Sequence, residues 1–200
     1  MPDYWTVSPE WKGETVYICG GGPSVADQNV ELLRGRKVIV INSSCYLLPW
    51  ADILFFADGR WWREHVKTVE AFAGRVVTTT DEMCGKNILT LRKRKPPGLA
   101  SDRSELTVLK TGMTASINLA AHLGAKRIVL LGADGGPSKD GRTHHHVPHN
   151  WGQIASNWKA QREELSTLVD PLRALGVEVL NASAISSIPY WPIVSLESCL

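Results

Sequence analysis

Four histidines lie within six residues of one another in a polar stretch of the chain: His144, His145, His146 and His149. An imidazole titrates near neutral pH, so it can take a proton from a hydroxyl group or coordinate a metal ion. The pattern favours one histidine acting as a general base. Metal ligation and a solvated loop remain as alternatives, because spacing within a loop is a weak indicator of a metal site.

A glycine-rich turn, Gly20-Gly21-Gly22-Pro23-Ser24, stands between an apolar run at 15–19 and a short helical pattern. Backbone N–H groups in such a turn, together with the positive end of a helix dipole, favour a bound anion such as phosphate. An ordinary NAD site is not expected, because Val25 replaces the last glycine of the dinucleotide fingerprint and Asn42 replaces its acidic ribose ligand. No P-loop motif occurs. The alternative is a tight turn without a ligand.

Polar residues follow three other apolar runs, as Asn42, Asp58 and Asp134. A short polar side chain at the end of a strand can bind ribose, a base, sugar hydroxyls or a metal ion, and helix capping is the alternative for Asn42 and Asp58. Asp134 precedes two glycines, which allow a ligand to approach it closely, and this favours a functional role. Thr111 and Gly112 begin a helix of small residues, where a second anion could bind or Thr111 could simply cap the helix.

These residues are separated by alternating strand and helix patterns. Apolar runs predict strands at 15–19, 37–41, 53–56, 76–79, 88–91, 127–131 and 177–180, and helical periodicity predicts helices at 25–35, 60–72, 113–123 and 154–175, the last kinked at Pro171. We therefore expect an α/β fold: a single Rossmann-like domain over residues 1–200, with an open, mostly parallel sheet and helices on both faces. In such folds ligands bind beyond the carboxyl ends of the strands.

Two segments are predicted to be loops, a mobile one over about 92–106 and the histidine-rich one over about 135–150. The first begins with the basic run Arg92, Lys93, Arg94 and Lys95. A solvated loop is the favoured interpretation of this run, and contact with a charged acceptor or with nucleic acid is the alternative.

Composition places the chain among ordinary globular proteins, with 44% hydrophobic and 21% charged residues. The 22 Lys and Arg against 20 Asp and Glu leave a net charge of +2, too balanced for a dedicated duplex-DNA binder. No apolar run is long enough to span a membrane and no secretory signal is evident, so we expect a cytoplasmic protein. The four cysteines show no C-x-x-C pairing, which predicts free, mostly buried thiols. Eight tryptophans allow a homo-oligomer.

Together the motifs resemble a known family over about residues 15–190. Gly20-Gly-Gly-Pro-Ser24, Asn42, Asp58, Thr111-Gly112, Leu130-Leu-Gly-Ala-Asp134 and the histidine loop are similar in order and spacing to the MptE-like group. This group includes archaeal 6-hydroxymethylpterin diphosphokinases and proteins of tailed phages, and it is similar in fold and motif order to small bacterial sialyltransferases that use CMP-sugars.

The resemblance implies roles for individual residues. Gly21, Gly22 and Ser24 would approach the donor phosphate together with Gly20. Asn42 and Asp58 would bind the nucleotide or the transferred group, Thr111 and Gly112 would line the same cleft, and the closing segment Asn181-Ala182-Ser183 would lie near the nucleotide. The place of the general base in the sialyltransferases would be filled by His149 or His146. Residues 92–110 are shorter than the segment covering the acceptor in those enzymes, so neither sialic acid nor pterin specificity follows.

The sequence thus predicts a transferase with a nucleotide-activated donor, most simply a glycosyltransferase of the CMP-sugar type that needs no cofactor. Its catalytic residues would be His149, His146 and Asp134, and its acceptor a hydroxyl group. The first alternative is diphosphoryl transfer from ATP, with Asp58 and Asp134 holding Mg²⁺. The second is a nucleotide-binding phage protein without catalytic activity.

Overall fold

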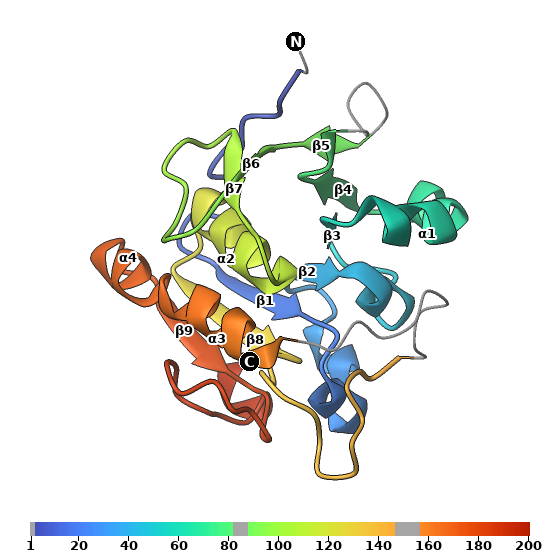
Figure 1. Ribbon diagram of the computed structural model, residues 1–200, viewed down its shortest axis with the longest axis vertical. Coiled ribbons are helices and arrows are strands. Elements are labelled where there is room, and N and C mark those ends of the chain that lie inside the picture. The colour runs from blue at the N-terminus through green and yellow to red at the C-terminus, as the bar shows by residue number, and fades with distance from the viewer. Residues whose placement is uncertain (1–2, 82–87, 147–156) are drawn as a thin grey trace.

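A computed structural model describes residues 3–81, 88–146 and 157–200 of the 200-residue chain (Figure 1). Its centre is a seven-stranded sheet in the order β5-β4-β3-β2-β1-β8-β9. The strands are β1 (Thr15–Cys19), β2 (Lys37–Ile41), β3 (Ile53–Phe56), β4 (Arg75–Thr78), β5 (Leu89–Thr90), β8 (Arg127–Leu131) and β9 (Glu178–Asn181). All neighbours in this sheet pair in parallel, which confirms the predicted fold class.

The strands are continuous apolar runs because both faces of the sheet are covered. Ile18 of β1 pairs with Ile39 of β2 on one side and with Leu130 of β8 on the other. Successive side chains of a strand point to opposite faces, so Ile18 belongs to one core cluster and its neighbours Tyr17 and Cys19 to the other.

Helices form the two outer layers. The helices α2 (Gly112–His122), α3 (Trp158–Ser166) and α4 (Val169–Ala174) contribute side chains to the core on one face, and α1 (Gly59–Ala71) contributes Trp61 and Val69 to the core on the other. The chain crosses from β1 outward to β5, and then returns to the other side of β1 to add β8 and β9. The direction of the strand order therefore reverses between β1 and β8, and a crevice is expected beyond the carboxyl ends of those two strands.

Two helical predictions differ from the structure in detail. The segment predicted as a helix at 25–35 forms two 3₁₀ helices, Pro23–Asp27 and Val30–Leu33. The segment predicted as one helix at 154–175 is divided into α3 and α4, and the break lies before Pro171 rather than at it. Pro171 sits in the first turn of α4, where no intrahelical N–H donor is needed.

The segment predicted as a loop at 92–106 contains regular structure. β6 (Arg92–Arg94) pairs in parallel with β7 (Glu105–Thr107) in a separate two-stranded sheet. The apolar spacing missed this pair because β6 is exposed throughout, whereas Leu106 of β7 is buried against the core. The basic side chains of β6 remain at the surface, where Arg92 pairs with Glu105.

The thiols of Cys19, Cys45 and Cys199 are free and buried, as predicted, and burial raises the pKa of Cys19 to about 12 and that of Cys45 to about 11. Cys84 lies outside the described residues. No helix in the described ranges is long and apolar enough to cross a bilayer.

Candidate functional site

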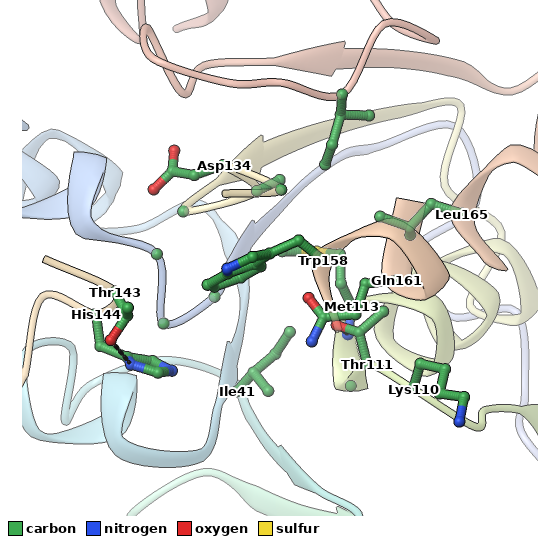
Figure 2. A pocket seen from close by; sticks show the side chains of 18 of the residues that line it. Ile41, Lys110, Thr111, Met113, Asp134, Thr143, His144, Trp158, Gln161 and Leu165 are labelled. Carbon is green, nitrogen blue, oxygen red and sulfur yellow. Dashed lines mark hydrogen bonds between the residues drawn. The ribbon is translucent and has the colours of Figure 1, made fainter. Parts of the chain in front are cut away.

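A cavity of about 230 Å³ opens where the strand order reverses. Its lining comes from segments far apart in the sequence: the glycine turn after β1, the turn after β8, the start of α2, and one face of α3 (Figure 2). Eight of the predicted site residues line it, namely Gly20, Gly21, Gly22, Asn42, Thr111, Gly112, Asp134 and His146. The structure thus brings together the motifs that follow separate strands.

The two turns at the base of the cavity are bonded to each other. The backbone N–H of Ser24 donates to Asp134 Oδ2 at 2.9 Å, and the N–H of Gly22 donates to the carbonyl of Gly132 at 3.2 Å. A Cβ on Gly22 would lie 2.5 Å from the oxygen of Gly132 and closer still to Asp134 Oδ2, so no larger residue fits there without displacing buried groups. Glycine is required at position 22 by this close approach.

Asp134 is almost fully buried, with 2% of its surface exposed. Burial raises the pKa of its carboxyl group above the usual range, against the stabilising effect of the Ser24 hydrogen bond. Its side chain points toward the glycine turn, where Oδ2 accepts the hydrogen bond from the backbone N–H of Ser24. A positioning role for Asp134 accounts for this geometry.

Asn181 and Ser183, predicted to lie near the nucleotide, are not among the residues that line the cavity. Both side chains are fully buried. Asn181 Nδ2 donates to the carbonyl of Ala133 at 3.2 Å, and Ser183 Oγ accepts from the N–H of Ala133 at 2.9 Å. These side chains therefore hold the turn that carries Asp134. Ser24 is also buried, and its backbone rather than its side chain contacts Asp134.

Asn42 has the backbone conformation that most clearly marks a functional position. Its φ of 51° makes it the only non-glycine residue with a positive φ among residues 3–81, 88–146 and 157–200. Such a conformation costs free energy and is commonly retained at ligand-binding sites. Its Oδ1 is buried and has no hydrogen-bond partner in the described structure. Asn42 borders the cavity, although this acceptor atom itself is covered as the side chain stands.

The start of α2 forms another wall of the cavity. Thr111 caps the helix, with its Oγ1 accepting from the N–H of Met113 at 3.2 Å, and a Cβ on Gly112 would lie 2.9 Å from Ile41. The buried carboxylate of Glu164 accepts from the N–H groups of Leu109 at 3.2 Å and Lys110 at 2.6 Å. The helix N-terminus is therefore held rigidly, with its positive dipole end at the cavity.

The central residue of the histidine run fastens that loop to the sheet. The backbone N–H of His145 donates to Gly21 O at 3.0 Å, and its Nε2 lies 3.0 Å from Ser44 Oγ. Ser44 Oγ donates its only proton to the carbonyl of Gly20 at 3.0 Å, so the Nε2 of His145 must be the protonated nitrogen that donates to Ser44. Burial and the neighbouring imidazoles lower the pKa of His145 to about 4. This histidine is neutral near pH 7, and so low a pKa makes it a weaker proton acceptor than an ordinary imidazole.

The neighbouring imidazoles lie over the glycine turn. A Cβ on Gly21 would meet His144 Cδ2 at 3.3 Å and His146 Nε2 at 3.4 Å, and the two rings lie 5.0 Å apart between centroids. The Nδ1 of His144 is bonded to Thr143 Oγ1 at 3.0 Å (Figure 2). His146 is thereby placed at the cavity, whereas the other predicted base, His149, lies outside the described residues.

Helix α3 supplies site residues that no motif indicated. Trp158, Gln161, Arg162 and Leu165 line the cavity, and in Figure 2 the indole of Trp158 extends across the middle of the view. Arg162 donates to the carbonyl of Gly135, which ties α3 to the turn after β8. Their spacing of i, i+3, i+4 and i+7 defines one helical face and was the available signal. What the sequence does not show is that this face is turned toward the glycine turn.

Asp58 lies apart from the residues that line the cavity. It caps α1 by accepting from the N–H of Arg60 at 2.8 Å, and its carboxylate pairs with the Arg60 guanidinium at 2.8 Å. This pairing lowers the pKa of Asp58. Among the residues that the structure describes, no group of three or more His, Cys, Asp or Glu side chains is arranged to hold a metal ion. The alternative Mg²⁺ pair of Asp58 and Asp134 stays a prediction: Asp134 lines the cavity and keeps a buried Oδ1 without a hydrogen-bond partner in the described structure, whereas Asp58 pairs with Arg60 and is not among the lining residues.

No protein-family model matches the chain, and no curated protein sequence does either. Solved structures of an α/β transferase do resemble it. The chain is similar to the sialyltransferase CstII from Campylobacter jejuni in complex with cytidine-5′-monophosphate, with a TM-score of 0.58 at 12% identity over 91% of this chain and 85% of that one. CstII in complex with CMP-3FNeuAc gives a TM-score of 0.52 at 12% identity, over 90% and 86% of the two chains. A sialyltransferase-like fold is therefore shared.

Proposed function

We propose that the protein is a glycosyltransferase that binds a nucleotide-activated sugar of the CMP-sugar type in the cavity between β1 and β8. One observation carries the proposal: the cavity joins a glycine turn, a helix N-terminus, the strained Asn42 and the imidazole of His146 at the switch point of the sheet. The similarity to CstII structures holding CMP and CMP-3FNeuAc supports this donor class.

The donor phosphate would lie against the glycine turn and the start of α2. The N–H of Gly21 has no acceptor among the described residues, and Thr111, Gly112 and Met113 at the start of α2 line the same cavity. Both would stabilise the negative charge that builds on the departing phosphate, which is the effect that a preorganised site provides most strongly. Asn42, which borders the cavity, would contact the nucleotide or the sugar.

The reaction moves one glycosyl group and one proton. The acceptor hydroxyl oxygen attacks the anomeric carbon of the sugar and forms the new C–O bond, while the bond from that carbon to the phosphate oxygen breaks and CMP leaves with the electron pair. The hydroxyl proton passes to a histidine. His146 is the predicted base that lines the described cavity, where His144 lies beside it, and His149 remains a candidate outside the described residues.

Two other functions stay as proposals of lower rank. Membership of the MptE-like group would fit diphosphoryl transfer from ATP, with Asp134 at the cavity and Asp58 released from Arg60 as the Mg²⁺ ligands. A nucleotide-binding phage protein without turnover would share the cavity and lack a functional base.

The test is CMP release from a panel of CMP-sugars that includes CMP-N-acetylneuraminic acid, with hydroxyl acceptors and with EDTA present. We expect release by the wild type and a loss of at least 100-fold in kcat for His146→Ala or for His149→Ala, whichever is the base, with donor affinity nearly unchanged. The control is Lys67→Ala, at an exposed position of helix α1. A large loss of donor affinity in both loop variants would overturn the assignment of a base, and CMP binding without any release would favour the non-catalytic alternative.

A further inference from the structure

A second cavity lies at the opposite ends of the strands from the site described above. It encloses about 660 Å³, within the range of small-molecule sites. Lys12 precedes β1, Ala125 precedes β8 and Val177 precedes β9, and all three line this cavity. Since these strands are parallel, the groove lies at their amino ends, and its contents do not contact the candidate donor site.

The walls of the groove are apolar. They come from Leu99, Pro171, Ala174, Leu175 and Val177. Leu175 keeps 63% of its surface exposed, the highest value among the large apolar side chains that the structure describes. A concave apolar surface of this kind gains free energy when a ligand covers it, by roughly 25 cal/mol for each Å² removed from water.

The polar groups beneath these walls already have partners. Asn118 Oδ1 accepts from the N–H groups of Ala100 at 2.9 Å and Thr107 at 3.1 Å, and Nδ2 donates to the carbonyl of Ala100 at 3.3 Å. His122 Nε2 lies 3.0 Å from the carbonyl of Glu105. An apolar ligand body could therefore cover this floor without leaving a buried polar group unpaired.

Two cations, Lys12 and Arg103, complete the lining, which contains no carboxylate. The nearby Asp102 carboxylate is engaged by the N–H and hydroxyl of Ser104, each at 2.8 Å. Neither cation has an ion pair with any residue that the structure describes. The lining therefore carries two cations without a direct ion pair among the described residues, with the Asp102 carboxylate and the C-terminal ends of α2 and α4 nearby.

Lys12 and Arg103 are not needed to cap the C-terminal ends of the adjoining helices α2 and α4. At the end of α2 the N–H of Ala125 donates to the carbonyl of Ala120 at 3.0 Å, and at the end of α4 the N–H of Val177 donates to the carbonyl of Leu172 at 3.0 Å. These backbone bonds already satisfy carbonyl groups that a basic side chain could otherwise cap.

We propose that this groove is a second binding site, for a small amphipathic anion whose apolar body lies against α4 and whose acidic head binds Lys12 and Arg103. The charge of the lining selects an anion over a cation, and the apolar walls select a ligand with a hydrocarbon or aromatic body over inorganic phosphate. The site is independent of the proposed transferase activity.

The test compares two fluorescent probes that differ by one sulfonate, 8-anilinonaphthalene-1-sulfonate and the neutral N-phenyl-1-naphthylamine, on the full chain. We expect one sulfonated probe per chain, not displaced by CMP. The double variant Lys12→Gln/Arg103→Gln should weaken binding of the sulfonated probe about tenfold, or about 1.4 kcal/mol. It should change binding of the neutral probe less than twofold. The control is Lys93→Gln/Lys95→Gln, which removes two positive charges from the exposed basic run at 92–95. It should change the binding of neither probe.

A blocking variant locates the probe. Ala174→Trp, at an exposed position of α4, should abolish binding of both probes. The proposal is overturned if Ala174→Trp leaves binding intact, if the charge variant weakens both probes equally, or if sedimentation shows a dimer that Ala174→Trp dissociates, since the groove would then bind a second copy of the chain. The charge variants decide the question by themselves should Ala174→Trp not fold.

Discussion

Replacing Ser44 by alanine tests whether the histidine loop is fastened to the sheet as described. The Ser44 hydroxyl is fully buried and takes part in two hydrogen bonds of 3.0 Å, one donated to the carbonyl of Gly20 and one accepted from His145 Nε2. Each bond contributes about 0.5–1.5 kcal/mol, and the buried N–H of His145 would be left without an acceptor. We therefore expect a loss of about 2–3 kcal/mol in the free energy of unfolding.

The chain offers a closely matched control. Ser116 on α2 is also fully buried, and its hydroxyl has no hydrogen-bond partner in the described structure, so Ser116→Ala removes the same atom without breaking a bond. Urea unfolding should place Ser44→Ala about 2–3 kcal/mol below the wild type and Ser116→Ala within about 0.5 kcal/mol of it. For a chain of this length the first loss corresponds to a fall of roughly 4–12 °C in Tm.

The same variant should loosen the imidazoles that lie over Gly21. CMP affinity should then fall for Ser44→Ala and stay unchanged for Ser116→Ala. If both variants lose the same stability, the contact between Ser44 and His145 does not hold the loop, and the assignment of the His145 tautomer is refuted with it.

Two more predictions concern the glycine turn and acid pH. Gly22→Ala should cost about 1–3 kcal/mol in unfolding free energy and abolish CMP binding, because its Cβ would collide with Gly132 and Asp134. The control Gly136→Ala should retain both stability and binding, because its Cβ would meet only Ser187 Oγ at 3.4 Å. Equal effects of the two variants in urea unfolding and calorimetry would contradict the close approach at Gly22. The unfolding free energy should decrease from pH 7 to pH 5, because the folded-state pKa of His145 is depressed to about 4 and the unfolded chain therefore binds protons first. For this group the unfolding free energy changes by at most about 1.4 kcal/mol per pH unit, and its partial exposure reduces that slope. The raised pKa of Asp134 acts with the opposite sign. An unfolding free energy that rises toward pH 5 would refute the neutral, buried imidazole of His145.

The sheet was predictable because its signal is local. Runs such as 37–41 and 127–131 are apolar throughout, which in a short segment bounded by turns indicates a strand covered on both faces. The exposed strand β6 has no such pattern, because its stability comes from pairing with β7 rather than from its own side chains. The break before Pro171 likewise depends on how α3 and α4 pack.

The site was predictable only in part, for a related reason. Residues that follow strands, such as Gly22 and Asn42, share an edge of the sheet once the strands are parallel, and the structure places both at the cavity. Asn181 ends β9 in the same way, but its amide bonds to the turn after β8, which only tertiary structure reveals. The pairing of Ser44 with His145, 101 positions apart, carries no local sequence signal.

The most direct test of the central claim, a nucleotide site between β1 and β8, is a thermal-shift titration of the full chain with CMP, UDP, GDP, ADP and ATP, each with Mg²⁺ and with EDTA. Ligands that bind the native state stabilise it by mass action and therefore raise Tm. At a ligand concentration of 100 times Kd, the free energy of unfolding increases by about 2.7 kcal/mol. We predict a shift with CMP that persists in EDTA and is absent in Gly22→Ala. A shift with ATP alone that requires Mg²⁺, or none with any nucleotide, would contradict the account.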